Sequence, residues 1–189
     1  MSAPTELPAI VSRAHDASRL AGYVGFCRNE TGRLLAALAA TREGTMAEFG
    51  TGVGVGTAWL RSGVRGDKTR IVTAELDSHL ASAAVAIFAD DDSVDVLTAD
   101  WSTLRDKGPF SLLFLDSENP DAVGVDLIAD LVEPGGIVVL DDFSPCESWP
   151  PINEGRVDVL REAWLSDPRF TTAEVLVAPD SSVVLATKR

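Results

Sequence analysis

A glycine-rich segment at residues 48–57 has the residue types and spacing of a binding loop. It reads Glu-Phe-Gly-Thr-Gly-Val-Gly-Val-Gly-Thr, so that an acid and then alternate glycines follow an apolar run and precede a segment of helix length. Glycine adopts positive φ without strain and lets a ligand lie against the backbone, because no Cβ intervenes. We therefore expect a small polar ligand at this loop. The alternative is a glycine-rich turn that binds nothing.

The glycine spacing and Glu48 together indicate the kind of ligand. The dinucleotide fingerprint G-x-G-x-x-G does not fit, because Val55 or Thr57 occupies its third glycine position, depending on the starting glycine. The carboxylate of Glu48 would repel a pyrophosphate, but it would accept hydrogen bonds from an ammonium group. The loop thus favours a nucleoside that carries an amino acid, and a nicotinamide oxidoreductase is the least favoured function.

Acids also stand at the ends of the next two apolar runs. Glu75 lies at the end of the run at 70–76, and Asp100 follows the run at 94–99. A ribose bound at the carboxyl edge of a sheet needs a hydrogen-bond acceptor at the end of the second strand, which makes Glu75 the candidate. For Trp101, which follows Asp100, two interpretations stay open: it stacks on a base, or it packs in the core.

Three aspartates end the fourth and fifth apolar runs. Asp116 ends the run at 110–116, and Asp141 and Asp142 end the run at 136–142. If these runs are neighbouring parallel strands about 4.8 Å apart, the three carboxylates can converge on one ion. Oxygen ligands suit Mg²⁺, Ca²⁺ or Mn²⁺. The alternative is that each aspartate only ends its strand or caps the next helix.

The elements that must position these residues alternate along the chain. Short apolar runs suited to buried parallel strands are separated by segments suited to crossover helices at 55–63, 78–89, 101–107 and 121–132. Two helices are expected within 6–40, one helix at 155–166, and a terminal hairpin at 170–178 and 181–188. The pattern predicts an α/β fold with seven strands, the last pair antiparallel and helices on both faces of the sheet.

The glycine loop resembles motif I of class I S-adenosylmethionine (SAM)-dependent methyltransferases. The longer segment EFGTGVGVGTAWL is similar to the catechol-type, metal-dependent O-methyltransferase family. The resemblance implies a Rossmann-like seven-stranded sheet of order 3-2-1-4-5-7-6 with the last strand antiparallel. It implies one methyltransferase domain over 1–189, in which N-terminal helices at 1–40 cap the site of an α/β core at 45–189.

The resemblance also implies roles for individual residues. Glu75 would bind the ribose of SAM, and Leu76 would pack on adenine. Asp116, Asp141 and Asp142 would bind a divalent metal, for which Mg²⁺ is the first candidate and Ca²⁺ or Mn²⁺ the alternatives. The implied cofactor-binding residues are Glu48, Gly50, Thr51, Gly52, Gly54, Thr57, Glu75, Leu76, Asp100, Trp101 and Asp116.

The sequence departs from the family at Trp101, where the family has a small residue, and at two places near the predicted metal site. The family has a lysine three residues after the fourth-strand aspartate, where this chain has Asn119, and it has Asp-Asn where this chain has Asp141-Asp142. The expected catalytic residues are therefore Asp116 and Asn119, of which Asn119 can only orient the acceptor. His15, on an N-terminal helix, is an alternative base.

Composition limits the partners. The chain has 189 residues, 46% of them hydrophobic, with 16 basic and 29 acidic residues and a formal net charge of -13. This charge disfavours nucleic acid and anionic membranes. The sequence shows neither a bilayer-spanning apolar stretch nor an export signal, and it has two cysteines, so a cytoplasmic protein without a disulfide framework is expected.

These observations predict a SAM-dependent methyltransferase that methylates oxygen of a small-molecule acceptor with the help of a divalent metal. Two alternatives stay open. One is a metal-independent methyltransferase that acts on another nucleophile of a small molecule, and the other is a catalytically silent SAM-binding protein. The family resemblance also makes a homodimer possible.

Overall fold

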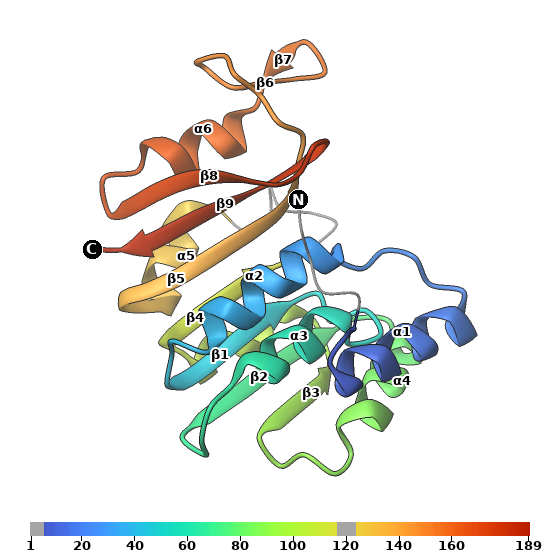
Figure 1. The fold of residues 1–189 in the computed structure, drawn as a ribbon. Helices are drawn as coiled ribbons and strands as arrows, with labels where there is room; N and C mark the ends of the chain where they lie inside the picture. The colour runs from blue at the N-terminus through green and yellow to red at the C-terminus, as the bar shows by residue number, and fades with distance from the viewer. Residues whose placement is uncertain (1–5, 117–123) are drawn as a thin grey trace.

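The computed structural model describes residues 6–116 and 124–189 and has a seven-stranded sheet at its centre (Figure 1). The strand order is β3-β2-β1-β4-β5-β9-β8. The strands are β1 (Gly44–Phe49), β2 (Thr69–Glu75), β3 (Val94–Thr98), β4 (Phe110–Leu115), β5 (Val132–Phe143), β8 (Phe170–Ala178) and β9 (Ser181–Lys188).

The pairing directions place the loops of the predicted site at one edge of the sheet. Strands β1 to β5 are parallel to one another, whereas β9 is antiparallel to both β5 and β8. The predicted order 3-2-1-4-5-7-6 is confirmed, because β8 and β9 are the sixth and seventh strands of this sheet along the chain. The carboxyl ends of β1, β2, β3, β4 and β5 therefore lie at the same edge.

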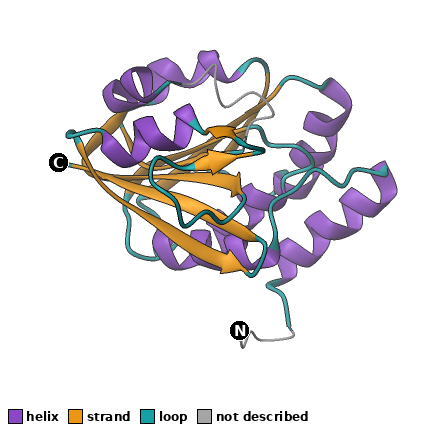
Figure 2. Ribbon diagram, turned by 90° about the horizontal axis from the view of Figure 1, so that it is seen from above, coloured by secondary structure: helices purple, strands orange, loops and turns teal. Residues whose placement is uncertain are grey.

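Helices cover both faces of the sheet, as predicted (Figure 2). One core cluster packs α1 (Ala9–Ala21), α2 (Asn29–Ala39), α3 (Val55–Gly63) and α4 (Ser78–Phe88) on one face. A second cluster packs the 3-10 helix η1 (Trp101–Lys107), α5 (Val125–Leu131) and α6 (Val159–Ser166) on the other. Adjacent strand residues belong to different clusters, as Leu112 and Leu113 do, because side chains alternate along a strand.

The two N-terminal helices pack closely on the rest of the chain. Helix α1 contacts α3 and α4, and α2 contacts α3. Gly32 of α2 lies so near α3 that a Cβ there would be 2.2 Å from the ring of Trp59. This approach fixes α2 and the loop that precedes it against the core.

The predicted helix at 155–166 is wrong in its first part. Residues of that part form a small hairpin of β6 (Ile152–Asn153) and β7 (Arg156–Val157), and α6 begins only at Val159. The two turn residues, Glu154 and Gly155, both have positive φ, at 50° and 78°, which suits a tight hairpin turn and not a helix. Asp158 then caps α6, because its carboxylate accepts a hydrogen bond from the Arg161 N–H.

The predicted helix at 101–107 has the expected bounds but is a 3-10 helix. Strand β5 begins at Val132, four residues before the predicted start. In the part of the chain that the structure describes, we find no helix of the length and apolar character needed to cross a membrane.

Candidate active site

The glycine loop makes a tight turn between β1 and α3. Gly50, Gly52 and Gly54 all have positive φ, at 94°, 52° and 93°. The N–H groups of Gly50 and Thr51 donate to the carbonyl oxygen of Ala74 in β2, at 3.2 and 3.3 Å. The predicted need for glycine at these positions is therefore met by the backbone conformation, and the loop is held against the end of β2.

Glu75 connects the glycine loop to the end of β2. Its Oε2 accepts a hydrogen bond from the Gly52 N–H and its Oε1 accepts one from the Asp77 N–H, each at 2.8 Å. The side chain of the next residue, Leu76, is 74% exposed at the same strand end. A carboxylate and an open apolar side chain thus lie together where the ribose and base contacts were predicted.

Glu48 lies beneath the glycine loop and is completely buried. Thr57 and Thr73 donate hydrogen bonds to its Oε2, while Oε1 has no partner among the described residues. Burial raises the pKa of Glu48 from 4.5 to about 8, against the opposing effect of these hydrogen bonds. Glu48 therefore supports the loop from below, and its contact with a ligand ammonium group stays a prediction.

The sequence analysis did not identify Gly56 or Tyr23 as parts of this site. A Cβ at Gly56 would lie 2.0 Å from Glu48 Oε1, so that glycine is needed over the buried carboxyl. Tyr23, from the loop between α1 and α2, lies over the glycine loop, since a Cβ at Gly52 would be 2.8 Å from the Tyr23 ring. The contact of Tyr23 with Gly52 joins segments far apart in sequence and leaves no local pattern to recognise, whereas Gly56 lies within the glycine-rich segment itself.

Asp100 and Trp101 follow β3 at the same edge. Asp100 is exposed and caps η1, because its carboxylate accepts a hydrogen bond from the Ser102 N–H at 2.9 Å. The ring of Trp101 is stacked on Phe49 with centroids 5.1 Å apart, and the Arg105 guanidinium carbon is 5.3 Å from the Trp101 centroid. Trp101 thus has the core contact that was one of its two predicted roles.

The three aspartates line one cavity of about 460 Å³ beyond the ends of β4 and β5. We call it the β4–β5 cavity. Its lining residues are Leu115, Asp116, Leu140, Asp141, Asp142, Phe143, Ser144, Asn153, Val157, Asp158, Val159, Leu160 and Arg161.

The aspartates have different environments in this cavity. Burial and the carboxyls of Glu48 and Asp141 raise the pKa of Asp116 well above its ordinary value. Burial likewise raises the pKa of Asp141 to about 6, although Thr31 of α2 donates a hydrogen bond to its carboxylate at 3.1 Å. Asp142 is exposed and has a positive φ of 66°.

The predicted metal site does not fit this arrangement. Within residues 6–116 and 124–189, no group of three His, Cys, Asp or Glu side chains is placed to hold one ion. The strand ends bring the three aspartates to one cavity, as predicted. The left-handed backbone at Asp142 nevertheless turns away from the regular strand geometry on which convergence of the three carboxylates depended.

Two residues considered as catalytic groups are not placed in the described site. Asn119 lies outside the described residues. His15 packs edge-on against Phe26, with ring centroids 5.1 Å apart, and its Nε2 is hydrogen bonded to Asn29 Oδ1 at 3.0 Å.

Both cysteines of the chain, Cys27 and Cys146, are free thiols, so the structure has no disulfide between them.

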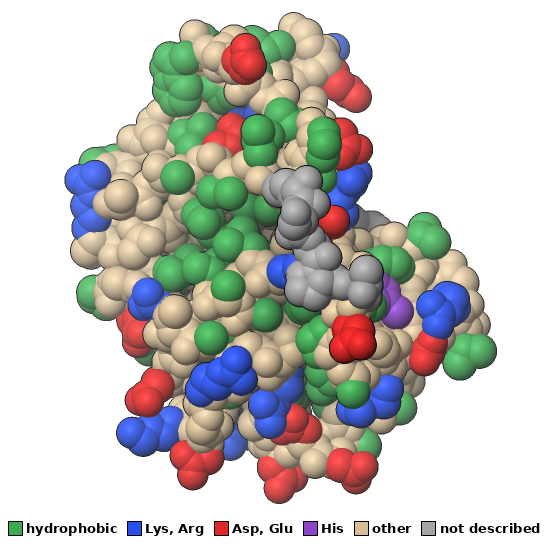
Figure 3. All heavy atoms as spheres, in the orientation of Figure 1, with side chains coloured by type: hydrophobic (Ala, Val, Ile, Leu, Met, Phe, Trp, Pro, Cys, Tyr) green, Lys and Arg blue, Asp and Glu red, His purple; other side chains and the backbone are tan. Residues whose placement is uncertain are grey.

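The outer side of the cavity is formed by α6 and the segment around the β6–β7 hairpin. Figure 3 shows hydrophobic side chains at the top of the molecule, over this hairpin and the loop before it. Trp149 is 64% exposed there, so it does not pack in the core, and Val157 and Val159, which line the cavity, are 42% and 68% exposed. The cavity therefore has carboxyl groups at the strand ends and apolar side chains on its outer wall.

Comparison with known proteins supports the fold through structure, not sequence. No family model and no curated protein matches this sequence. The structure is similar to the O-methyltransferase from Bacillus cereus in complex with SAH, at 19% identity and a TM-score of 0.75, over 97% of this chain and 93% of that chain.

Two other solved structures are equally similar. The O-methyltransferase TomG from Streptomyces achromogenes, in complex with SAM, matches at 21% identity and a TM-score of 0.76, over 97% of this chain and 92% of its own. The cofactor-bound protein Rv0187 from MTB matches at 24% identity and a TM-score of 0.76, over 98% of this chain and 92% of its own. The chain therefore has the Rossmann-like fold of class I methyltransferases, in the form that SAM-bound and SAH-bound O-methyltransferases have.

Proposed function

We propose that this protein is a SAM-dependent methyltransferase that acts on a small-molecule acceptor, with oxygen as the accepting atom. The observation that carries this proposal is the hydrogen bond between Gly52 N–H and Glu75 at the carboxyl edge of a sheet with this strand order. It joins the glycine loop to a carboxylate that can accept hydrogen bonds from a ribose. The names of the similar O-methyltransferases support the choice of oxygen.

The residues around the glycine loop would hold the cofactor. Glu75 would bind the ribose hydroxyls and Leu76 would cover one face of adenine, while Asp100 would lie near the base. Tyr23 would close the loop from the side of the N-terminal helices. Gly52 and Gly54 allow the loop to pack tightly, because a Cβ at Gly52 would be 2.8 Å from Tyr23 and one at Gly54 would be 3.0 Å from Phe88.

The β4–β5 cavity would hold the acceptor. Asp116 lines this cavity, and its N–H donates to the carbonyl oxygen of Phe49 at 3.1 Å. Phe49 is the last residue of β1, directly before the glycine loop. Because the ends of β1 and β4 are adjacent, the two proposed ligands would lie next to each other. Asp116 is the residue that we propose to orient the acceptor.

Bound SAM supplies an electrophilic methyl group: an acceptor lone pair forms the new bond as the carbon–sulfur bond breaks, and S-adenosylhomocysteine (SAH) and a proton are released. The protein contributes alignment of the two ligands, which is the main requirement for an in-line displacement. We include no metal ion in this reaction, because the described carboxylates do not form a set of ligands for one.

Binding of SAH tests the proposal without knowledge of the acceptor. Thermal unfolding with SAH at 100 times its dissociation constant should show a stabilisation of about 2.7 kcal/mol, or a rise in Tm of roughly 5–10 °C. NADH and ATP serve as comparison ligands and should give no rise. Absence of a rise with SAH would reject the methyltransferase. Binding of SAM without transfer to any acceptor would favour the silent SAM-binding protein.

A further inference from the structure

Residues 22–28 connect α1 to α2 and pass over the edge of the sheet where the two ligands would meet. Tyr23 lies over the glycine loop, since a Cβ at Gly52 would be 2.8 Å from its ring. Cys27 is only 3% exposed. Burial raises the pKa of the Cys27 thiol, and so do the carboxyls at the ends of β1, β4 and β5, those of Asp116, Asp141, Glu48 and Asp142. We call residues 22–28 the strap.

The two helices that the strap connects are fixed to the rest of the protein. Helix α1 contacts α3 and α4, and α2 contacts α3. In α2, Thr31 donates a hydrogen bond to Asp141 at 3.1 Å, and a Cβ at Gly32 would be 2.2 Å from Trp59. The strap begins at Gly22, which has a positive φ of 64° and no atom within 4 Å of an added Cβ. Because a few such positions can absorb the φ/ψ change of a hinge, the strap can move while both helices stay in place.

Phe26 and Arg28 attach the strap to two different parts of the protein. The ring of Phe26 lies edge-on against that of His15 in α1, with centroids 5.1 Å apart. Arg28 Nη1 and Nη2 donate to the two carboxylate oxygens of Asp180 at 3.0 and 2.9 Å. Arg28 occupies the N-cap position of α2, but its side chain makes no cap hydrogen bond there. The guanidinium therefore ties the end of the strap to the other half of the sheet.

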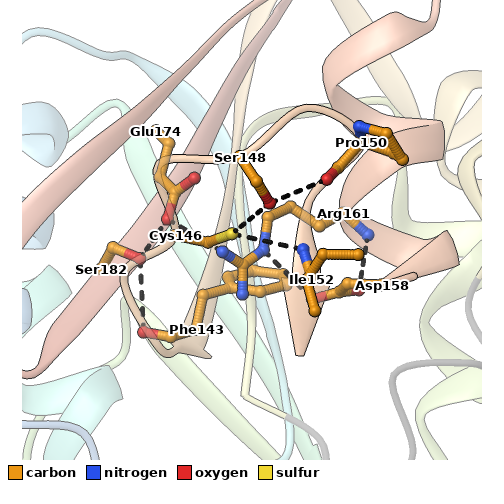
Figure 4. A network of polar contacts seen from close by, with 9 residues as sticks. All are labelled: Phe143, Cys146, Ser148, Pro150, Ile152, Asp158, Arg161, Glu174 and Ser182. Carbon is orange, nitrogen blue, oxygen red and sulfur yellow. Dashed lines mark hydrogen bonds and ion pairs between the residues drawn. The ribbon is translucent and has the colours of Figure 1, made fainter. Parts of the chain in front are cut away.

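The Asp180 side of this pair lies on a well-fixed base. Asp180 is in the turn between β8 and β9, and the start of β9 is joined to the end of β5, because the Ser182 hydroxyl donates to the Phe143 carbonyl oxygen at 3.3 Å (Figure 4). Glu174 of β8 accepts hydrogen bonds from Ser182 and from the buried Arg161, the latter at 3.3 Å. When the pair breaks, the strap is therefore the part that is released.

Water reaches the pair of Arg28 and Asp180. The side chains are 50% and 68% exposed, so the pair contributes little energy and is weakened by salt. Its two parallel hydrogen bonds nevertheless define one geometry, as they do in other arginine–carboxylate pairs. Such a contact can break and re-form by local opening while the protein stays folded.

We propose that the strap must open for SAM to enter and for SAH to leave, and that the Arg28–Asp180 pair is the latch that holds it closed. The inference rests on the proposed function, because it takes the site beneath the strap as the cofactor site. Arg28 and Asp180 are positioning residues, which act on cofactor exchange through the strap. Screening of their charges makes the rate of exchange depend on ionic strength.

The buried thiol of Cys27 reports opening of the strap without any ligand. In a Cys146→Ser background it is the one thiol of the chain, and its reaction with the neutral disulfide dithiodipyridine requires exposure. We expect Asp180→Asn to raise the rate of this reaction about two- to fivefold. Asp95→Asn removes a carboxylate from another exposed arginine pair, Arg70–Asp95, and should leave the rate unchanged.

Release of SAH tests the effect on the cofactor. Tritium-labelled SAH would be displaced from the loaded protein by excess unlabelled SAH, and Asp180→Asn should release it about two- to fivefold faster than the wild type and Asp95→Asn do. Raising KCl to about 0.5 M should speed release from the wild type and have little effect on Asp180→Asn. The exchanged pair, Arg28→Asp with Asp180→Arg, should restore slow release, which a structural role of either residue alone would not do.

Equal rates in Asp180→Asn and Asp95→Asn, for either the Cys27 reaction or SAH release, would overturn the proposal. So would an exchanged pair that fails to restore slow release, or a loss of stability to urea in Asp180→Asn that accounts for the faster Cys27 reaction. A protein that binds SAH and shows no effect of Asp180→Asn would keep the methyltransferase and lose the latch. A protein whose Cys27 responds but that binds no SAH would lose the proposed function and, with it, the cofactor role of the strap.

Discussion

Gly52 and Glu75 form a hydrogen bond of 2.8 Å that crosses from the loop after β1 to the end of β2. Since the other oxygen of Glu75 accepts from the Asp77 N–H, the carboxylate is held between two backbone donors. Charge-assisted hydrogen bonds of this kind are stronger than neutral ones. The orientation of Glu75 is therefore set before any ligand arrives.

Replacing Glu75 should weaken SAH binding with little effect on the fold. In Glu75→Gln an amide NH₂ takes the place of one carboxylate oxygen, so that a backbone donor or a ribose hydroxyl loses its acceptor. We expect the SAH dissociation constant, measured by calorimetry, to rise about 10- to 100-fold. Asp92→Asn removes an exposed acid near β3 and serves as the control. Equal affinities of the two variants would show that Glu75 does not bind the cofactor.

The sequence predicted those parts of the site that depend on strand order and local backbone. Glycines at alternate positions and an acid at the end of the second strand have local causes, and the structure places them as expected. The aspartates at the ends of β4 and β5 reach one cavity because parallel neighbours end at one edge. The direction of the Asp142 side chain depends on the positive φ at that residue, which the sequence pattern does not specify.

The parts that sequence reasoning missed depend on contacts between distant segments. Tyr23 reaches Gly52 from the N-terminal loop, and Arg161 pairs with Glu174 from a neighbouring strand. Arginine on a predicted amphipathic helix normally indicates a solvent-exposed position, and here it is 1% exposed. Only tertiary packing shows that this charge is buried.

Glu48 should make the stability of the protein depend on pH. Its pKa is about 8 in the folded protein, so between pH 4.5 and about 8 the folded state binds this proton more tightly than the unfolded state does. The free energy of unfolding therefore falls as the pH rises through this range. Between pH 5 and 8 the fall should be about 2–4 kcal/mol smaller in Glu48→Gln than in the wild type, as measured by urea unfolding.

The exposed acid Glu43 provides the control for this comparison. Glu43→Gln should show the full wild-type fall, because its side chain is largely solvated. Asp141, whose raised pKa has other causes, contributes equally to all three proteins. Glu48 helps to raise the pKa of Asp116, so the difference reports Glu48 together with its effect on Asp116. The same fall in Glu48→Gln and the wild type would mean that Glu48 is ionised in the folded protein at neutral pH.

Removal of divalent metal should leave cofactor binding and stability unchanged. The described carboxylates of Asp116, Asp141 and Asp142 do not form a three-ligand group, so neither Mg²⁺ nor EDTA should shift the Tm of the SAH-loaded protein. Thermal unfolding in EDTA and in a Mg²⁺ series measures this directly. A Tm that rises with Mg²⁺ in the wild type and not in Asp141→Asn would restore the metal site predicted from the sequence.

Two arginines that each contact carboxylates should differ greatly in their effect on stability. Arg161 is 1% exposed between Asp158 and Glu174, whereas Arg28 and Asp180 form a two-bond pair in which the side chains are 50% and 68% exposed. Water solvates the charges that remain when an exposed pair is broken. It does so far less for a buried pair, where a charge without its partner is costly.

Arg161→Met should therefore lower the free energy of unfolding by about 3–5 kcal/mol, because it leaves Asp158 and Glu174 without their shared cation. Arg28→Met, an equal change in side chain, should lower it by less than about 1 kcal/mol. Urea unfolding of both variants at pH 7 measures the difference. If the two variants lose the same stability, the Arg161 network contributes no more than a surface ion pair.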